Sequence, residues 1–113
     1  MTEVSTEMIE KNIKSSTKYK TLGQYEKVLL WIYYLSQKDV PICLRELINL
    51  TEMSEPTVYG QLTELDDLQF IKCNIKIIPK KKRVRDSKWN LKIKFADEGS
   101  KTYAERLYQS VTR

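Results

Sequence analysis

The sequence predicts a mostly helical α+β domain in which several helices precede one basic β-hairpin and a single helix follows it. Apolar residues recur at helical spacing before residue 68 and again after residue 97. Between residues 71 and 95 they alternate with polar residues, which is the pattern of strands. Positive charge gathers in the same stretch, because residues 71–94 hold ten Lys and Arg and one acid, Asp86. The expected order is α-α-β-α-α-β-β-α.

The length and composition predict a single domain. A chain of 113 residues that is 41% hydrophobic is expected to bury one core. We divide it into an N-terminal helix or arm at residues 1–20, a central unit at residues 21–95 and a C-terminal helix at residues 96–113.

The N-terminal part carries a weak helical pattern. Ile9 and Ile13 lie four residues apart, as on one helix face. The polar stretch 14–20 is interpreted as a connection. Thr21 and Gln24 then have the spacing of a capping box, which predicts the start of a strong helix.

That strong helix is apolar on every side. One stripe follows helical spacing and consists of Tyr25, Val28, Leu29, Ile32 and Leu35. Aromatic residues occupy the remaining faces, so we expect terminal helices or a partner subunit to cover them. A homodimer is therefore predicted, with a candidate interface of Trp31, Tyr33, Tyr34, Tyr103, Leu107 and Val111.

The middle of the chain predicts two helices joined by a turn. Residues 39–43 are expected to be extended, because Pro41 disfavours helix for the residue before it. A short helix then begins at Leu44. After a turn at residues 51–54, Ser54 is expected to cap a helix that tolerates Pro56 in its first turn and ends near Asp67.

The hairpin consists of two amphipathic strands around a basic connection. The apolar positions of the strands are Ile71, Cys73, Ile75, Ile77, Trp89, Leu91, Ile93 and Phe95. Between them lies a concentrated positive charge, which attracts phosphate polyanions. The candidate nucleic-acid-binding residues of this part are Lys80, Lys81, Lys82, Arg83, Arg85 and Lys88. The alternatives are a solvated lysine-rich edge that blocks aggregation and a nuclear localisation signal. Asp97 and Glu98 suit the first turn of the last helix.

Little in the sequence supports catalysis or metal binding. There is no histidine, and Cys43 and Cys73 are the only cysteines, so the chain lacks the four ligands of a structural zinc site. Glycine-rich phosphate loops are absent. We therefore expect no enzyme, no metal and no cofactor. No apolar run approaches the roughly 20 residues of a membrane span, and the amino terminus does not resemble a secretory signal. These features predict a cytoplasmic protein, nuclear only in a eukaryotic host.

Residues 44–71 resemble the winged helix-turn-helix family of DNA-binding proteins. The sequence fits the family pattern LxELxxxTxxSxxTVxxxLxxLxxLxFI from Leu44 to Ile71. The stretch Thr21 to Tyr25 before an apolar helix, and Asp97-Glu98-Gly99 after the hairpin, look like the MarR group of bacterial and archaeal regulators. The resemblance covers residues 21–108, and a compact archaeal, viral or plasmid relative fits equally well. The chain has one helix after the hairpin, where MarR proteins usually have two.

The resemblance implies that the helix 54–67 enters the major groove of double-stranded DNA and that the hairpin is a wing on the minor groove or backbone. The residues it implies for base and backbone contacts are Ser54, Glu55, Pro56, Thr57, Tyr59, Gly60 and Gln61. It also places the third strand between Cys43 and Cys73, beyond disulfide reach, so both are expected to be small buried residues. One departure stands out, because this helix has no Lys or Arg and carries Glu55, Glu64, Asp66 and Asp67.

The leading hypothesis is a dimeric, sequence-specific transcriptional regulator. The acidic helix keeps a second hypothesis open, a protein-interaction winged helix in a transcription or assembly complex. A third is a sequence-neutral architectural DNA binder that acts through the basic hairpin. The sequence does not reveal an operator, a regulated gene or an effector ligand.

Overall fold

The computed structural model describes residues 6–38, 41–74 and 90–112. The elements in chain order are α1 (Thr6–Ser15), α2 (Thr17–Lys20), α3 (Gln24–Ser36), β1 (Ile42–Cys43), α4 (Leu44–Thr51), α5 (Glu55–Asp67), β2 (Ile71–Cys73), β3 (Asn90–Leu91), β4 (Ile93–Phe95) and α7 (Glu98–Thr112). The predicted α+β class is confirmed: the described chain is mostly helical, with short antiparallel strand pairs.

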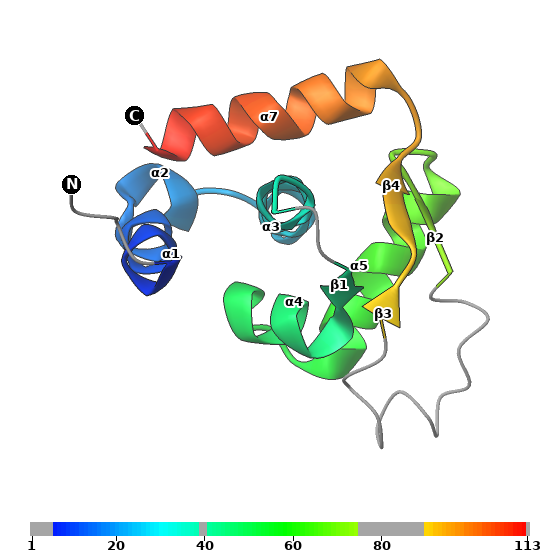
Figure 1. Cartoon of the computed structure of the whole chain (residues 1–113), viewed down its shortest axis with the longest axis horizontal. Coiled ribbons are helices and arrows are strands. Elements are labelled where there is room, and N and C mark those ends of the chain that lie inside the picture. The colour runs from blue at the N-terminus through cyan, green and yellow to red at the C-terminus, as the bar shows by residue number, and fades with distance from the viewer. Residues whose placement is uncertain (1–5, 39–40, 75–89, 113) are drawn as a thin grey trace.

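Helix α3 lies at the centre of the molecule. Figure 1 shows α3 end-on, between α7 on one side and α4 with α5 on the other. The helices α1 and α2 lie at one end of the molecule, and the strands lie at its opposite end. Its buried residues are Val28, Leu29, Leu30, Trp31, Ile32, Tyr34 and Leu35. The chain's own helices therefore cover the apolar faces that led us to expect a partner subunit on this helix.

The strands form two antiparallel pairs that share one continuous stretch of chain. β2 pairs with β4, with Ile71 opposite Phe95 and Cys73 opposite Ile93. β1 pairs with β3, with Ile42 opposite Leu91. Between β3 and β4, the backbone N–H of Lys92 donates to Oδ1 of Asn74 at 2.9 Å. Residues 90–95 thus pair first with the strand before α4 and then with the strand after α5.

The prediction for residues 14–20 was wrong. Helix α1 continues to Ser15, and α2 begins at Thr17 after a single intervening residue. The side chain of Tyr19 is only 6% exposed and accepts a hydrogen bond from Nε1 of the fully buried Trp31 at 2.9 Å. A contact with a residue twelve positions away thus anchors a segment whose polar composition suggested a loop.

The predicted capping box of Thr21 and Gln24 was also wrong. Helix α3 begins at Gln24, and Gly23 is its N-cap. The backbone N–H of Gly23 donates to Oε1 of Glu26 at 2.9 Å. The side chain that accepts from the N-cap backbone is therefore that of Glu26, two residues after the expected Gln24. Thr21 instead donates from Oγ1 to the carbonyl of Lys18 at 2.7 Å and closes the end of α2.

The two cysteines lie in different strand pairs. Cys43 ends β1 and Cys73 ends β2; both are half-buried, and no disulfide joins them. The stretch that contains β3 and β4 pairs with both of these strands and so lies between them, as the resemblance implied. Their partial exposure differs from the full burial that we expected.

Candidate nucleic-acid interface

A three-residue turn joins α4 to α5. Thr51, which is buried, donates from Oγ1 to the carbonyl of Leu47 at 2.6 Å and accepts the backbone N–H of Met53 at 3.3 Å. Glu52 has left-handed backbone, with φ of 58°, and its N–H reaches the carbonyl of Ile48 at 3.0 Å. These bonds satisfy the last groups of α4 and set the direction in which α5 starts.

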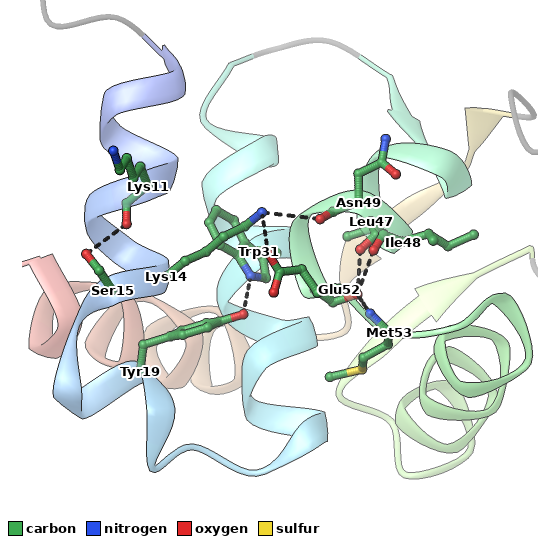
Figure 2. A network of polar contacts seen from close by, with 11 residues as sticks. Lys11, Lys14, Ser15, Tyr19, Trp31, Leu47, Ile48, Asn49, Glu52 and Met53 are labelled. Carbon is green, nitrogen blue, oxygen red and sulfur yellow. Dashed lines mark hydrogen bonds and ion pairs between the residues drawn. The ribbon is translucent and has the colours of Figure 1, made fainter.

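A lysine from the N-terminal helix supports this turn. Nζ of Lys14 donates to the carbonyl of Asn49 at 3.3 Å and lies 3.4 Å from Oε1 of Glu52 (Figure 2). A positive group at the carboxyl end of a helix is favourable, because it meets the negative end of the helix dipole. This support could not be predicted from the sequence, since the contacting residues lie 35 or more positions apart.

The amino-terminal end of α5 is built as the sequence predicted. Oγ of Ser54 accepts the backbone N–H of Thr57 at 3.4 Å and lies 2.9 Å from the Thr57 hydroxyl, and Pro56 occupies the first turn. Val58, Leu62 and Leu65 are buried, so the opposite side of the helix is left at the surface. Of the seven predicted contact residues of α5, Ser54, Pro56 and Gly60 are exposed, while Glu55, Thr57, Tyr59 and Gln61 are half-buried.

Gly60 lies in the middle of α5 without an intramolecular reason for a glycine. A Cβ built at this position would meet nothing within 4 Å, and the backbone φ is not positive. Glycine inside a helix costs about 1 kcal/mol relative to alanine. The fold of the chain alone therefore does not require this glycine, which leaves the helix backbone accessible at the surface.

Gln61 points toward the start of α3. Its Nε2 donates to Oε1 of Gln24 at 3.2 Å. The two glutamines line a groove of about 440 Å³, which is further lined by Tyr25, Glu64, Leu65, Leu68 and Phe70. Tyr25 is 44% exposed and Leu68 is 60% exposed, so this groove is partly apolar. The side chain that we expected to read a base is thus hydrogen-bonded to Gln24 and lines this groove.

The acids of α5 gather at its carboxyl end. Glu64 and Asp67 are exposed, and Oδ1 of Asp66 accepts the backbone N–H of Cys73 at 3.3 Å, which ties the end of α5 to β2. Glu55 alone lies at the amino-terminal end, in the first turn. Most of the negative charge of this helix is therefore separated from its capped amino-terminal end.

The base of the hairpin presents lysines on one face. Lys72, Lys92 and Lys94 are exposed, and Lys72 lies opposite Lys94 in the β2–β4 pair. The predicted contact residues of the tip lie outside the described residues; they are Lys80, Lys81, Lys82, Arg83, Arg85 and Lys88.

The predicted dimer residues lie mainly inside the single chain. Trp31 is fully buried, and Tyr34, Leu107 and Val111 are less than 10% exposed, while Tyr33 and Tyr103 are half-buried. The prediction that Trp31 lies at an interface was wrong, because its side chain is fully buried inside the chain. Tyr19 and Tyr34 pack edge-on against its ring at centroid distances of 6.0 and 5.4 Å. The more accessible apolar groups of the terminal helices lie elsewhere, with Met8 of α1 at 55% exposure.

No protein-family model, curated protein or solved structure matches the chain. In the part of the chain that the structure describes, no helix has the length and apolar character needed to cross a membrane. The same residues contain no group of three Cys, Asp or Glu side chains that could hold a metal ion.

Proposed function

We propose that the protein is a winged helix-turn-helix DNA-binding protein that regulates transcription. In this proposal α5 lies in the major groove, and the hairpin of residues 71–95 is the wing. The short turn between α4 and α5 supports a helix-turn-helix, a motif in which three or four residues join the two helices.

One observation carries the proposal: residues 90–95 join the strand before α4 to the strand after α5. β3 pairs with β1, and β4 pairs with β2. This pairing joins β2 and β4 beside the helix-turn-helix, with Lys72 opposite Lys94 and with Cys73 of β2 hydrogen-bonded to Asp66 of α5. In winged helices the recognition helix and the wing contact DNA together, and here α5 and the strands of the wing would lie side by side.

The surface of α5 fits an approach by its amino-terminal part. The exposed Gly60 permits close approach of the backbone, and Ser54 and Thr57 bring hydroxyls to the first turn. The acids Glu64, Asp66 and Asp67 lie at the opposite end of the helix. The net charge of +9 in residues 71–94 supplies attraction to phosphate, while sequence preference must come from α5 or from wing arginines in a groove.

The proposed regulator is a homodimer formed through its terminal helices. Met8 is exposed on α1, and a hollow of about 300 Å³ lies between α1 and α7, lined by Ile9, Asn12, Ile13, Tyr108, Val111 and Thr112. A dimer of this kind would present two copies of α5 to successive major grooves.

The groove beside α5 favours a second candidate function. Tyr25 and Leu68 expose apolar surface next to Glu64. A protein-interaction winged helix would use this surface to hold an apolar segment flanked by basic residues. A sequence-neutral architectural DNA binder is the third candidate, in which the wing alone makes the contacts.

The deciding experiment selects bound duplexes from random-sequence DNA. The parent protein is compared with a wing variant in which Lys80, Lys81, Lys82, Arg83 and Arg85 are alanine. Two further variants, Gly60→Leu and Gly60→Ala, form a matched pair on α5. Because nothing lies within 4 Å of the Gly60 Cβ position, both are expected to fold, and thermal unfolding checks this.

We expect the parent to enrich one motif and to bind with a log–log salt slope of roughly −5 if six phosphates are contacted. The wing variant should lose most of that slope. Gly60→Leu should lose the motif, while Gly60→Ala keeps it. Salt-sensitive binding without an enriched motif would favour the architectural binder, and no binding by the parent at low salt would contradict both DNA-binding functions.

A further inference from the structure

A hydrogen bond between two glutamine side chains joins α3 to α5. Nε2 of Gln61 donates to Oε1 of Gln24 at 3.2 Å, and the two residues lie 37 positions apart in the chain. Gln24 is the first residue of α3, and Gln61 lies in the middle of α5. The bond therefore links the amino-terminal end of the central helix to the helix that is proposed to lie in the major groove.

The backbone on both sides of this bond is held in place. Gly23, the N-cap before Gln24, donates its backbone N–H to Oε1 of Glu26 at 2.9 Å, which fixes the start of α3. On α5 the neighbour of Gln61 is Leu62, whose side chain is fully buried in the core. The two glutamine side chains thus extend toward each other from fixed positions.

The bond adds little to the stability of the fold. Gln24 is exposed and Gln61 is half-buried. At such a site water replaces a lost hydrogen bond between neutral side chains, and ordering two glutamine side chains costs conformational entropy. The pair is therefore better suited to orient an amide than to hold the two helices together.

The orientation of the Gln61 amide decides which base it can recognise. A glutamine amide has an oxygen that accepts and an NH2 group that donates two hydrogens, and half a turn about the last torsion exchanges them. In the major groove adenine offers an acceptor, N7, beside a donor, N6, so it needs the amide oxygen and nitrogen in one order. Guanine offers two acceptors, N7 and O6, and so suits donors alone.

The groove favours one orientation of this amide. Oε1 of Gln24 takes one of the two hydrogens on Nε2 of Gln61. Glu64 lines the same groove three residues after Gln61, a spacing that puts both on one side of α5. A carboxylate on this side repels the amide oxygen and favours the nitrogen. The amide nitrogen therefore faces the groove, and the amide oxygen stays available.

We infer that Gln24 is a positioning residue, which orients the Gln61 amide to recognise adenine in the major groove. The inference rests on the proposed function and adds to it a base and a residue outside the helix-turn-helix. With one hydrogen bonded to Gln24, Gln61 retains one N–H donor for N7 of adenine and its oxygen as the acceptor for the N6 amino group. Gln24 acts through Gln61 and makes no base contact of its own.

The test changes what position 24 offers to Gln61. Gln24→Ala removes the partner, Gln24→Glu can only accept a hydrogen bond, and Gln24→Lys can only donate one. Gln61→Ala is made alone and together with Gln24→Ala. The matched controls make the same three changes at Gln37, an exposed glutamine just after the other end of α3.

Each full-length protein is put through the selection from random-sequence DNA. It is then titrated with the selected duplex and with duplexes that carry the other base pairs at each position of the motif. Thermal unfolding without DNA checks that every variant folds.

We expect the parent to prefer adenine at one position of the motif, and Gln61→Ala to reduce that preference by about tenfold or more. Gln24→Ala should reduce the preference at the same position alone, and it should add nothing in the Gln61→Ala background. Gln24→Glu should keep adenine. Gln24→Lys should bond the Gln61 oxygen and shift the preference toward guanine. The changes at Gln37 should leave every base preference as in the parent.

Three outcomes would overturn the inference and leave the proposed function in place. The first is an unchanged base preference in Gln24→Ala. The second is loss of adenine in Gln24→Glu, because an acceptor at this position would then not orient Gln61. The third is an effect of Gln24→Ala in the Gln61→Ala background, because Gln24 would then contact the duplex itself. A parent that binds no DNA at low salt would overturn the proposed function and the inference together.

Discussion

Gln69 ends α5 with a backbone conformation that normally belongs to glycine. Its φ is 64°, its N–H donates to the carbonyl of Asp66 at 3.1 Å, and the next N–H, of Phe70, donates to Leu65 at 3.0 Å. These two bonds form the Schellman arrangement, which satisfies the last carbonyls of the helix and turns the chain into β2. A side chain at this left-handed position costs about 1 kcal/mol.

We expect Gln69→Gly to raise the free energy of unfolding by about 0.5–1 kcal/mol, because it removes the steric cost but adds freedom to the unfolded chain. Urea unfolding of the two proteins measures the change. Glu52→Gly is the comparison, since φ at Glu52 is 58° but its carboxylate pairs with Lys14. Its gain should be smaller by the worth of an exposed ion pair, about 0–1 kcal/mol. A loss of stability in Gln69→Gly would show that the glutamine side chain itself holds the turn.

Single residues could be predicted from the sequence where their partners are close in the chain. Ser54 as the cap of α5, Pro56 in its first turn and Asp97 before α7 were all readable, because each acts within three residues. The left-handed residues were not, since Glu52 and Gln69 carry none of the glycine or asparagine signal that marks such positions. Local chemistry is visible in a sequence, whereas backbone strain imposed by packing is not.

Among the elements, α1 packs against the core although its pattern of apolar residues in the sequence is weak. Ile13 is 1% exposed, and Oε2 of Glu10 accepts the hydroxyl hydrogen of Tyr34 at 3.2 Å. The same carboxylate oxygen lies 3.7 Å from Nζ of Lys38, two residues after the end of α3. These contacts fix α1 against α3, and Lys14 extends the contact to the turn before α5 (Figure 2). The segment that we expected to be an N-terminal helix or arm is therefore a helix that supports the candidate interface.

Ile13→Ala should lower the free energy of unfolding by about 2–4 kcal/mol, because it leaves a cavity where a fully buried side chain packs. Met8→Ala in the same helix is the matched control, since 55% of that side chain is exposed, and it should change stability by less than about 0.5 kcal/mol. Denaturant unfolding separates the two outcomes. Equal effects would mean that α1 packs less tightly than its burial indicates.

Some features of the strands could be predicted from the sequence, and one could not. The alternation from Ile71 predicted β2, and the alternation up to Phe95 predicted β4 with its correct face, since Lys72 and Lys94 are exposed. The break at Lys92 was not visible, because it depends on the side chain of Asn74, eighteen residues earlier, in place of a backbone partner. Periodicity gives the face of a strand but not its change of partner.

At the scale of the whole molecule, tyrosine and tryptophan side chains join helices from both ends of the chain. Tyr19 of α2 and Tyr34 of α3 pack edge-on against Trp31, and Tyr108 of α7 stacks on Tyr34 at a centroid distance of 6.1 Å. The sequence predicted an aromatic helix covered by terminal helices or by a partner subunit, and it could not decide between the two because those contacts are tertiary. In the described chain, α2 and α7 supply this cover.

This cluster should make stability fall at high pH. Burial raises the pKa of Tyr34, and the neighbouring Glu10 carboxylate raises it further, while burial also raises the pKa of Tyr19. The folded chain therefore keeps the phenol protons in a range where the unfolded chain, with a tyrosine pKa of about 10, releases them. The contribution is fully present below about pH 10 and is lost as the pH rises above that value.

Urea unfolding at several pH values between neutral and strongly alkaline, with the ultraviolet absorbance of tyrosinate as a second signal, measures this dependence. In the parent, tyrosinate should form at higher pH in the native state than in urea. Tyr34→Phe should be less stable at neutral pH, because it loses the hydrogen bond to Glu10, yet its stability should fall less steeply above about pH 10. If the two curves ran parallel, Tyr34 would ionise alike in the folded and unfolded chains, and the aromatic cluster would not exclude water as its burial implies.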